Sequence, residues 1–302
     1  MRKIKLVLPV IITLFTAFSQ ASFACDLHGK TGIVPDNNLY IPTGLKFANG
    51  GGITERQFNN VINRVSVLYT PVVKKLGGNL IFNRKWSDGT VNAYADRNDT
   101  PDGRNWNVSM FGGLARHPQM NEDGFAVVVC HELGHHLGGA PRKKDGTGAL
   151  RWAANEGQAD YYATLKCLRN YFANQNNQAA LKNVQVPETV STSCENSFAN
   201  ANEIAICERS AMAGFVLGNF FKVLTKSPKE VAFNTPDLSK VTITFDSHPA
   251  SQCRLDTYFQ GSLCDKSIKE DTHATDVNIG TCTERNGDTT GLRPNCWYAL
   301  AK

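Results

Sequence analysis

The sequence lacks several features that would place it in common classes of protein. It has no internal repeat and no run of basic residues, and the missing basic run argues against nucleic-acid binding. None of its nine cysteines belongs to a CxxC pair, so a cysteine-based zinc site is not expected. Hydrophobic residues make up 41% of the chain and charged residues 20%. That balance is typical of a packed core and excludes a wholly disordered or collagen-like chain.

Most of the excess of positive charge lies in the first 24 residues. The formal net charge is +5, but three of the basic residues and none of the acidic residues lie before residue 25, which leaves 29 basic against 27 acidic residues. A basic start, an apolar stretch from Leu6 to Phe18 and small residues up to Ala24 are typical of a secretory signal peptide. This apolar stretch is shorter than the roughly 20 residues that span a bilayer. The sequence therefore predicts a signal peptide over residues 1–24, with an uncleaved anchor as the alternative.

Export predicts an oxidising environment for the cysteines. No later apolar stretch is long enough to span a membrane, so the chain is expected to be periplasmic or secreted, with a lipid anchor through Cys25 as an alternative. Most of the cysteines should then form disulfides. Cys130 is expected to stay a buried thiol, because it lies on an apolar helix directly before His131. The remaining pairs are expected between sequence neighbours: Cys194 with Cys207, Cys253 with Cys264, and Cys282 with Cys296.

The apolar pattern divides the chain after residue 24 into three parts. Residues 25–53 are expected to form an irregular lead-in, residues 54–262 one domain, and residues 263–302 a tail held by its cysteines. Apolar residues at helical spacing predict helices over Thr54–Lys75, Asp123–Leu137, Trp152–Phe172 and Ser210–Leu224. Short strands are expected over Asn79–Asn83, Thr90–Ala95 and Trp106–Phe111, with a polar turn at Asn98–Gly103. The segments Arg142–Leu150 and 173–206 are expected to be loops.

One motif carries chemistry. His131-Glu132-Leu133-Gly134-His135 matches HExxH. On a helix the two histidines lie on one face and can bind the same metal ion. Glu132 lies beside them, where it can hold and deprotonate a metal-bound water. The alternative is that both histidines are capping or core residues of an ordinary helix.

A third ligand is available on the next predicted helix. A catalytic zinc ion has three protein ligands and one open position. Twenty residues separate His135 from Glu156, enough for the chain to turn back and present this carboxylate. Asp160 follows one turn later on the same face and can accept a hydrogen bond from a ligand histidine. The alternatives are an exposed helix acid for Glu156 and a surface salt bridge for Asp160.

Two further residues could supply positive hydrogen-bond donors. Ser247-His248-Pro249 is expected to open a helix that carries Arg254, with Pro249 at its first position. His248 and Arg254 could stabilise an oxyanion opposite the zinc. The alternative for His248 is a histidine at a helix start with no part in catalysis.

The order of these motifs resembles the gluzincin peptidases over about two thirds of the chain, from Thr54 to Gln260. The branch with the greatest similarity is the CAAX prenyl protease family, with its HtpX-like heat-shock and periplasmic assembly-factor peptidases. The matching set comprises Val91–Ala95, a strand near Val108, Gly112-Gly113-Leu114, His131–His136, Glu156 with Asp160, and His248-Pro249 with Arg254.

The resemblance implies an α+β zincin-like fold with a small mixed sheet. It also implies zinc ligands at His131, His135 and Glu156, a general base at Glu132, and a residue at His248 that either helps or restrains catalysis. The spacing from HExxH to Glu156 is closer to that of thermolysin-like enzymes, and the spanning helices of the integral-membrane relatives are lacking. Prenylated peptides are therefore not expected as substrates.

Together these features predict an exported endopeptidase with one catalytic Zn²⁺ that acts on a protein or peptide substrate. The strand at Trp106–Phe111 is expected at a sheet edge, where it would pair with an extended peptide. A first alternative is a zinc-binding chaperone or assembly factor whose protease site is latent or weakly active, with His248 in the open coordination position. A second is a structural or inhibitory secreted module.

Overall fold

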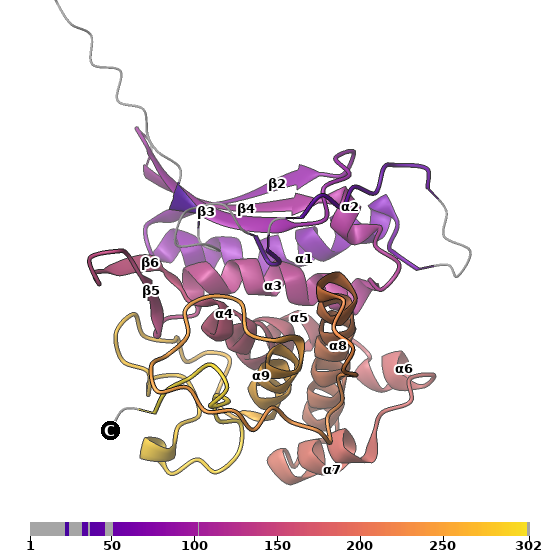
Figure 1. Ribbon diagram of the computed structural model, residues 1–302, viewed down its shortest axis with the longest axis vertical. Helices are drawn as coiled ribbons and strands as arrows, with labels where there is room; N and C mark the ends of the chain where they lie inside the picture. Colours follow the sequence, from indigo (N-terminus) through magenta and orange to yellow (C-terminus); the bar gives the residue numbers. More distant parts are fainter. Residues whose placement is uncertain (1–21, 24–31, 36, 46–50, 102, 301–302) are drawn as a thin grey trace, which may run out of the picture.

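The computed structural model describes residues 22–23, 32–35, 37–45, 51–101 and 103–300. Cys25 and most of the predicted signal peptide lie outside these residues. The chain forms an α+β fold in layers, with a sheet over helices α1 (Glu55–Lys75) and α3 (Glu122–Leu137) and further helices beneath them (Figure 1). The α+β class and the small mixed sheet are confirmed.

The sheet has four strands in the order β1-β3-β4-β2. Its central pair is antiparallel, β2 is parallel to β4, and β1 is antiparallel to β3. Strand β4 therefore lies between two others, and the predicted edge position of Trp106–Phe111 is wrong. A strand paired on both sides has no free backbone groups for a peptide. The four strands are β1 (Ser22–Phe23), β2 (Gly78–Lys85), β3 (Ala93–Thr100) and β4 (Gly103–Phe111).

Strand β3 starts later and ends later than the sequence predicts. The first three residues of the expected polar turn, Asn98–Thr100, belong to the strand, and the turn itself is shorter, at Pro101. The strand is longer because its polar side chains pair across to β4. The Asn107 amide donates to the carboxylate of Asp96 and to the side-chain oxygen of Asn98, both at 2.6 Å. Cross-strand pairs of this kind stabilise a strand that an apolar pattern misses.

The N-terminal segment runs along the other side of β3. Ile33 donates its backbone N–H to the carbonyl of Ala93 (3.1 Å), and Tyr40 forms an antiparallel bridge with Thr90. Ile33 and Val34 are buried, with exposed fractions of 0% and 2%. The described part of the predicted lead-in therefore packs along the edge of the sheet.

Helix α1 forms as predicted because its signals are local. Thr54 and Gln57 make a reciprocal capping box, and the helix continues through Pro71 to Lys75. Its apolar face packs against the sheet and against α3. Helix α3 is buried on all sides over Gly124–His136, since it lies between the sheet layer and the second layer of helices.

The segment after α3 differs from the prediction. Arg142–Leu150 is not a loop but part of a hairpin, with strands β5 (Arg142–Lys144) and β6 (Leu150–Ala154). The following helix α4 (Glu156–Tyr162) therefore begins four residues later than expected. Asn155 sets this start, because its side chain accepts the backbone N–H of Gln158 at 2.9 Å. The helix continues as a π-helical turn, η1 (Ala163–Leu168), and then as α5 (Arg169–Phe172).

Residues 173–206 also hold more structure than a loop. Asn176 and Asn200 cap helices with their side chains, so an Asn-rich composition marks helix starts here. Helix α8 is long and apolar enough to cross a membrane, a feature that the shorter predicted helix lacked, yet 61% of its apolar window is buried inside the molecule. The three helices are α6 (Asn177–Leu181), α7 (Glu188–Ser197) and α8 (Ala201–Thr225).

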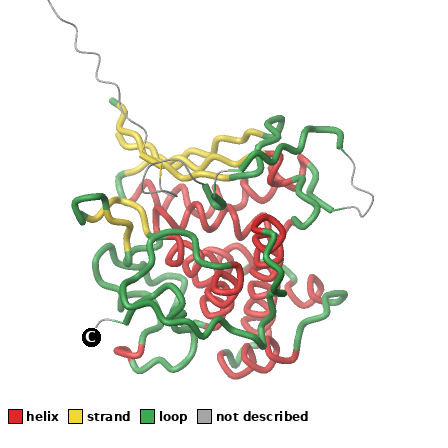
Figure 2. The backbone as a smooth tube through the Cα atoms, viewed as in Figure 1, coloured by secondary structure: helices red, strands yellow, loops and turns green. Residues whose placement is uncertain are grey.

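The C-terminal tail is mostly loop with one short 3₁₀ turn, η2 (Glu284–Asn286), and packs beside α9 (Ser251–Leu263) (Figure 2). Of the predicted disulfides, Cys194–Cys207 is confirmed. Pairing of Cys253 with Cys264 is wrong, because eleven residues of helix separate them by roughly 16 Å, far beyond disulfide reach. The tail instead returns to both ends of α9 through Cys253–Cys296 and Cys264–Cys282.

The buried thiol predicted at Cys130 is also wrong. Cys130 of α3 is joined to Cys167 of η1, with their Cα atoms 5.5 Å apart. The two helical segments pack side by side, which brings together cysteines that are 37 residues apart in the sequence. Four disulfides are typical of an oxidising compartment outside the cytoplasm.

Removing the Cys130–Cys167 disulfide should destabilise the fold without removing any polar contact of the predicted metal-binding residues His131, His135 and Glu156. In the double variant Cys130→Ala/Cys167→Ala we expect the free energy of unfolding to fall by about 2–4 kcal/mol, because the unfolded chain regains the entropy of the closed loop. Denaturant titration checks this value. An unchanged midpoint would contradict a bracing role for this bond.

His117 should make stability depend on pH. Burial lowers the pKa of His117 from 6.5 to about 4, so below pH 6.5 the unfolded chain binds more protons than the folded one. Stability is then lost as the pH falls from about 6.5 to about 4, by on the order of 2 kcal/mol. The variant His117→Asn keeps an acceptor for the Gln119 N–H but has no titrating group. Thermal unfolding at several pH values should show a smaller acid loss in the variant, and equal losses would disprove the assignment.

Candidate metal centre

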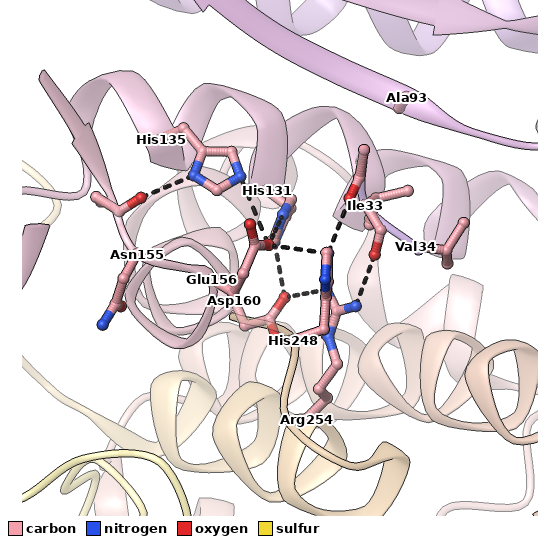
Figure 3. Close-up of polar contacts among 12 residues, drawn as sticks. Ile33, Val34, Ala93, His131, His135, Asn155, Glu156, Asp160, His248 and Arg254 are labelled. Carbon is pink, nitrogen blue, oxygen red and sulfur yellow. Dashed lines mark hydrogen bonds and ion pairs between the residues drawn. The ribbon is translucent and has the colours of Figure 1, made fainter. Parts of the chain in front are cut away.

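Helices α3 and α4 bring three potential metal ligands together. His131 and His135 lie one turn apart on α3, and Glu156 is the first residue of α4 (Figure 3). The Nε2 atoms of His131 and His135 lie 3.3 and 3.7 Å from Oε2 of Glu156. All three side chains are fully buried. The structure thus brings together the three residues that the sequence singles out.

Hydrogen bonds orient both imidazole rings. Nδ1 of His131 lies 2.7 Å from Oδ1 of Asp160, and Nδ1 of His135 lies 2.9 Å from the carbonyl oxygen of Ala154. Both partners are acceptors, so each Nδ1 carries the proton and donates it. The other ring nitrogen of each histidine, Nε2, then faces Glu156. This is the arrangement that a metal-binding histidine requires.

The spacing and the donor types fit a single metal ion. Donor atoms about 2.1 Å from a tetrahedral ion lie roughly 3.4 Å apart, close to the two measured separations. Within the described residues, Nε2 of His131 and Oε2 of Glu156 have no hydrogen-bond partner. Two histidines and one glutamate are a ligand set that catalytic zinc sites use. In the part of the chain that the structure describes, two other clusters of potential ligands each contain a disulfide, whose sulfur atoms are already bonded.

Lys143 of β5 is a member of the site that sequence reasoning missed. Its Nζ lies 2.9 Å from Oε1 of Glu156, and the side chain is 2% exposed. Burial alone would raise the pKa of Glu156, but the charges of Lys143, His248 and His135 outweigh it and hold the pKa well below its usual value. The lysine binds one carboxylate oxygen and leaves the other to the histidines. Only its place in a short basic segment before Glu156 could have drawn attention to it.

Asp160 is a buried residue that binds several side chains next to the candidate ligands, and it is not a surface acid. Its carboxylate accepts two hydrogen bonds from Arg254, each at 2.8 Å, and one from the hydroxyl of Tyr258. Burial would raise the pKa of Asp160, but Arg254 and His131 lower it to about 2. For His131, burial is outweighed by Asp160, which raises the pKa to about 9. Asp160 therefore accepts a hydrogen bond from His131, which is the contact that the sequence predicts.

His248 lies beside Glu156 of the cluster, whereas Arg254 binds the carboxylate of Asp160. Nε2 of His248 is 2.8 Å from the carbonyl oxygen of Gly32 and 3.4 Å from Oε2 of Glu156. Arg254 uses Nε and one terminal nitrogen for Asp160, and donates from the other to the carbonyl of Ile33 at 2.7 Å. Helix α9 begins at Ser251, after an N-cap at Ala250. The predicted first helical position of Pro249 is therefore wrong.

The remaining predicted residue, Glu132, is buried on α3 beside the first ligand. Its negative charge contributes to the raised pKa of His131, which places its carboxylate within electrostatic reach of the cluster. Comparisons of the chain with protein-family models, curated proteins and solved structures gave no significant match. The interpretation of the site therefore depends on its geometry.

The ligand assignment predicts which histidines of the HELGHH run hold metal. We expect one bound zinc ion per wild-type chain and a loss of more than about 90% of it in His135→Ala or Glu156→Gln, because two ligands bind far more weakly than three. His136→Gln is the matched control. Both ring nitrogens of His136 already bind other groups, Nδ1 the guanidinium of Arg97 and Nε2 the carbonyl of Asn107. Elemental analysis after dialysis measures the content, and loss in the control alone would overturn the assignment.

Proposed function

We propose that the protein is an exported zinc-dependent endopeptidase of gluzincin type with a zincin-like fold. The convergence of His131, His135 and Glu156, with all three ligand atoms within 4.8 Å of one another, carries the proposal. The second support is the ordered set of motifs around them in the sequence. The four disulfides and the signal-like N-terminus favour the periplasm or the extracellular space.

The two histidines and Glu156 would hold the ion, and Lys143 would keep one oxygen of Glu156 away from it. A bound zinc ion supplies Lewis acidity to the scissile carbonyl and lowers the pKa of water to about 7. Glu132 accepts the proton of the attacking water and passes it to the nitrogen of the leaving amine. Asp160 keeps the proton of His131 on Nδ1, so that Nε2 stays available as a ligand.

The chain also offers groups that would hold a substrate backbone. The carbonyl of Ala93 and the side-chain amide of Asn92 bind the backbone of Ile33 and Val34 in this structure, as they would bind an extended peptide. His248 presents Nε2 to a carbonyl oxygen, which suits a donor to the tetrahedral oxyanion. Arg254 donates a hydrogen bond to the next backbone carbonyl, that of Ile33. In this proposal its main part is to position Asp160.

The second candidate is a zinc-binding chaperone or assembly factor with a latent or weakly active protease site. It requires His248 to fill the open coordination position, and the 3.4 Å separation from Oε2 of Glu156 is the observation in its favour. The shorter contact of His248 with the carbonyl of Gly32, at 2.8 Å, favours the endopeptidase.

Replacing the general base should abolish proteolysis and leave zinc in place. In Glu132→Gln we expect casein hydrolysis to fall at least about 100-fold, because proton transfer from the water is lost. Fluorescent casein with zinc content measured in parallel provides the assay.

Glu122→Gln, in the half-buried first turn of the same helix, is the matched control and should keep full activity, because glutamine still offers an oxygen to the Gln57 side chain. Equal activity of wild type and Glu132→Gln would refute the mechanism. Zinc-loaded wild type that cleaves nothing would favour the latent alternative.

A further inference from the structure

The segment Gly32–Pro35 lies in the candidate metal centre with the contacts of a bound peptide. Figure 3 shows Ile33 and Val34 between Ala93 on one side and His248 with Arg254 on the other. Gly32, Ile33 and Val34 are buried, and Pro35 is exposed. The segment comes from the far end of the chain, since 216 residues separate Gly32 from His248. Nothing in its local sequence requires it to lie there.

Both atoms of the Gly32–Ile33 peptide group that can form hydrogen bonds are held by the site. The Gly32 carbonyl oxygen lies 2.8 Å from Nε2 of His248. The Ile33 N–H donates to the carbonyl of Ala93 at 3.1 Å. His248 is also 3.4 Å from Oε2 of Glu156, so this carbonyl lies beside the ligand cluster.

The residues that follow are held in register as well. Arg254 donates to the carbonyl of Ile33 at 2.7 Å. The Asn92 side chain accepts the N–H of Val34 at 3.4 Å and donates to its carbonyl at 3.3 Å. Four consecutive backbone groups after the Gly32 carbonyl are thus satisfied by residues of the site. One of these bonds is to the backbone of β3, and the other three come from the side chains of Arg254 and Asn92.

The close approach at Gly32 selects glycine. A Cβ atom there would lie 2.1 Å from both the carbonyl oxygen of Ala93 and the side-chain oxygen of Asn92. One of these is a backbone atom of β3 and cannot move aside cheaply. The segment fits this position because residue 32 has no side chain.

We propose that the Gly32–Ile33 bond of the chain itself is a substrate of this site, so that the protein removes its own N-terminal residues. This inference rests on the proposed endopeptidase function. One water molecule is consumed and the carbon–nitrogen bond breaks. Gly32 gains the hydroxyl oxygen and ends as a carboxylate, while the nitrogen of Ile33 gains protons and becomes the ammonium of a new N-terminus.

Self-cleavage would open the site to other peptides. The residues up to Gly32 would leave, and with them the carbonyl that occupies His248. The short new end, Ile33–Pro35, would then leave Ala93 and Asn92 free for a substrate. The chain would stay anchored further on, where Ile41 donates its N–H to the carbonyl of Gly89 at 2.7 Å. The processed chain keeps all three metal ligands and Glu132.

The N-terminus of the purified protein tests the proposal. We expect zinc-loaded wild type to begin with Ile-Val-Pro, and Glu132→Gln to keep the Gly32–Ile33 bond at least about 100-fold longer. Intact mass and N-terminal sequencing measure both. Cleavage within one chain should proceed at a rate independent of protein concentration. A Glu132→Gln chain that acquires the Ile33 terminus at the wild-type rate would show that another protease cuts there, and would overturn the proposal.

A glycine substitution gives an independent test. Gly32→Ala should leave the bond intact because the new Cβ displaces the segment, whereas Gly146→Ala should be processed like wild type, since a Cβ at that glycine meets open space. Circular dichroism and zinc content check that both variants fold. Processing of Gly32→Ala at the wild-type rate would contradict the proposed fit.

A synthetic peptide separates this inference from the proposed function. The peptide LHGKTGIVPDNN, which copies residues 27–38, should be cut between its second glycine and the isoleucine by wild type and not by Glu132→Gln. If casein is cleaved in a Glu132-dependent manner while the chain stays intact at Ile33 and the peptide is not cut, self-cleavage is wrong and the endopeptidase stands. If neither casein, the peptide nor the chain is cut, both are wrong.

Discussion

The Asp160 carboxylate is the interaction on which the rest of the structure depends. It is fully buried and binds His131 of α3, Arg254 of α9 and Tyr258 of α9, while its own helix α4 carries Glu156. One charge therefore joins three helices and, through Arg254, the N-terminal segment at Ile33. A buried charge of this kind is stable only when every partner is present. The three candidate metal ligands lie on α3 and α4, two of the helices that this network joins.

The part of the site that sequence reasoning recovers is the part that local geometry determines. Residues four apart on a helix share a face, so His131 with His135, and Glu156 with Asp160, follow from spacing alone. Lys143 and Gly32 do not follow. Lys143 reaches Glu156, and Gly32 reaches His248, through tertiary contacts. The relative placement of these elements cannot be inferred from the sequence of any one of them. The role of Arg254 is a mixed case, since its position was predicted but its main partner, Asp160, was not.

The same distinction applies to the fold. Features that neighbouring residues determine were predicted, and features that distant contacts determine were not. Helix α1 was predicted almost to the residue because Thr54 and Gln57 cap it within four residues of sequence. The place of β4 in the sheet depends on two partners that lie elsewhere in the chain. The disulfides of α9 show the limit most clearly. Sequence neighbours were paired in the prediction, but a helix holds Cys253 and Cys264 at opposite ends, so each finds its partner in the returning tail.

The Cys130–Cys167 disulfide has a consequence for where the protein can work. It joins the residue directly before the ligand His131 to the segment that continues the Glu156 helix, so it fixes the two ligand-bearing elements against each other. In a reducing cytoplasm this bond does not form. The stability of the fold around the site is then coupled to the redox state of the surroundings. For the proposed endopeptidase, a chain that has not yet left the cytoplasm would therefore be the less stable form.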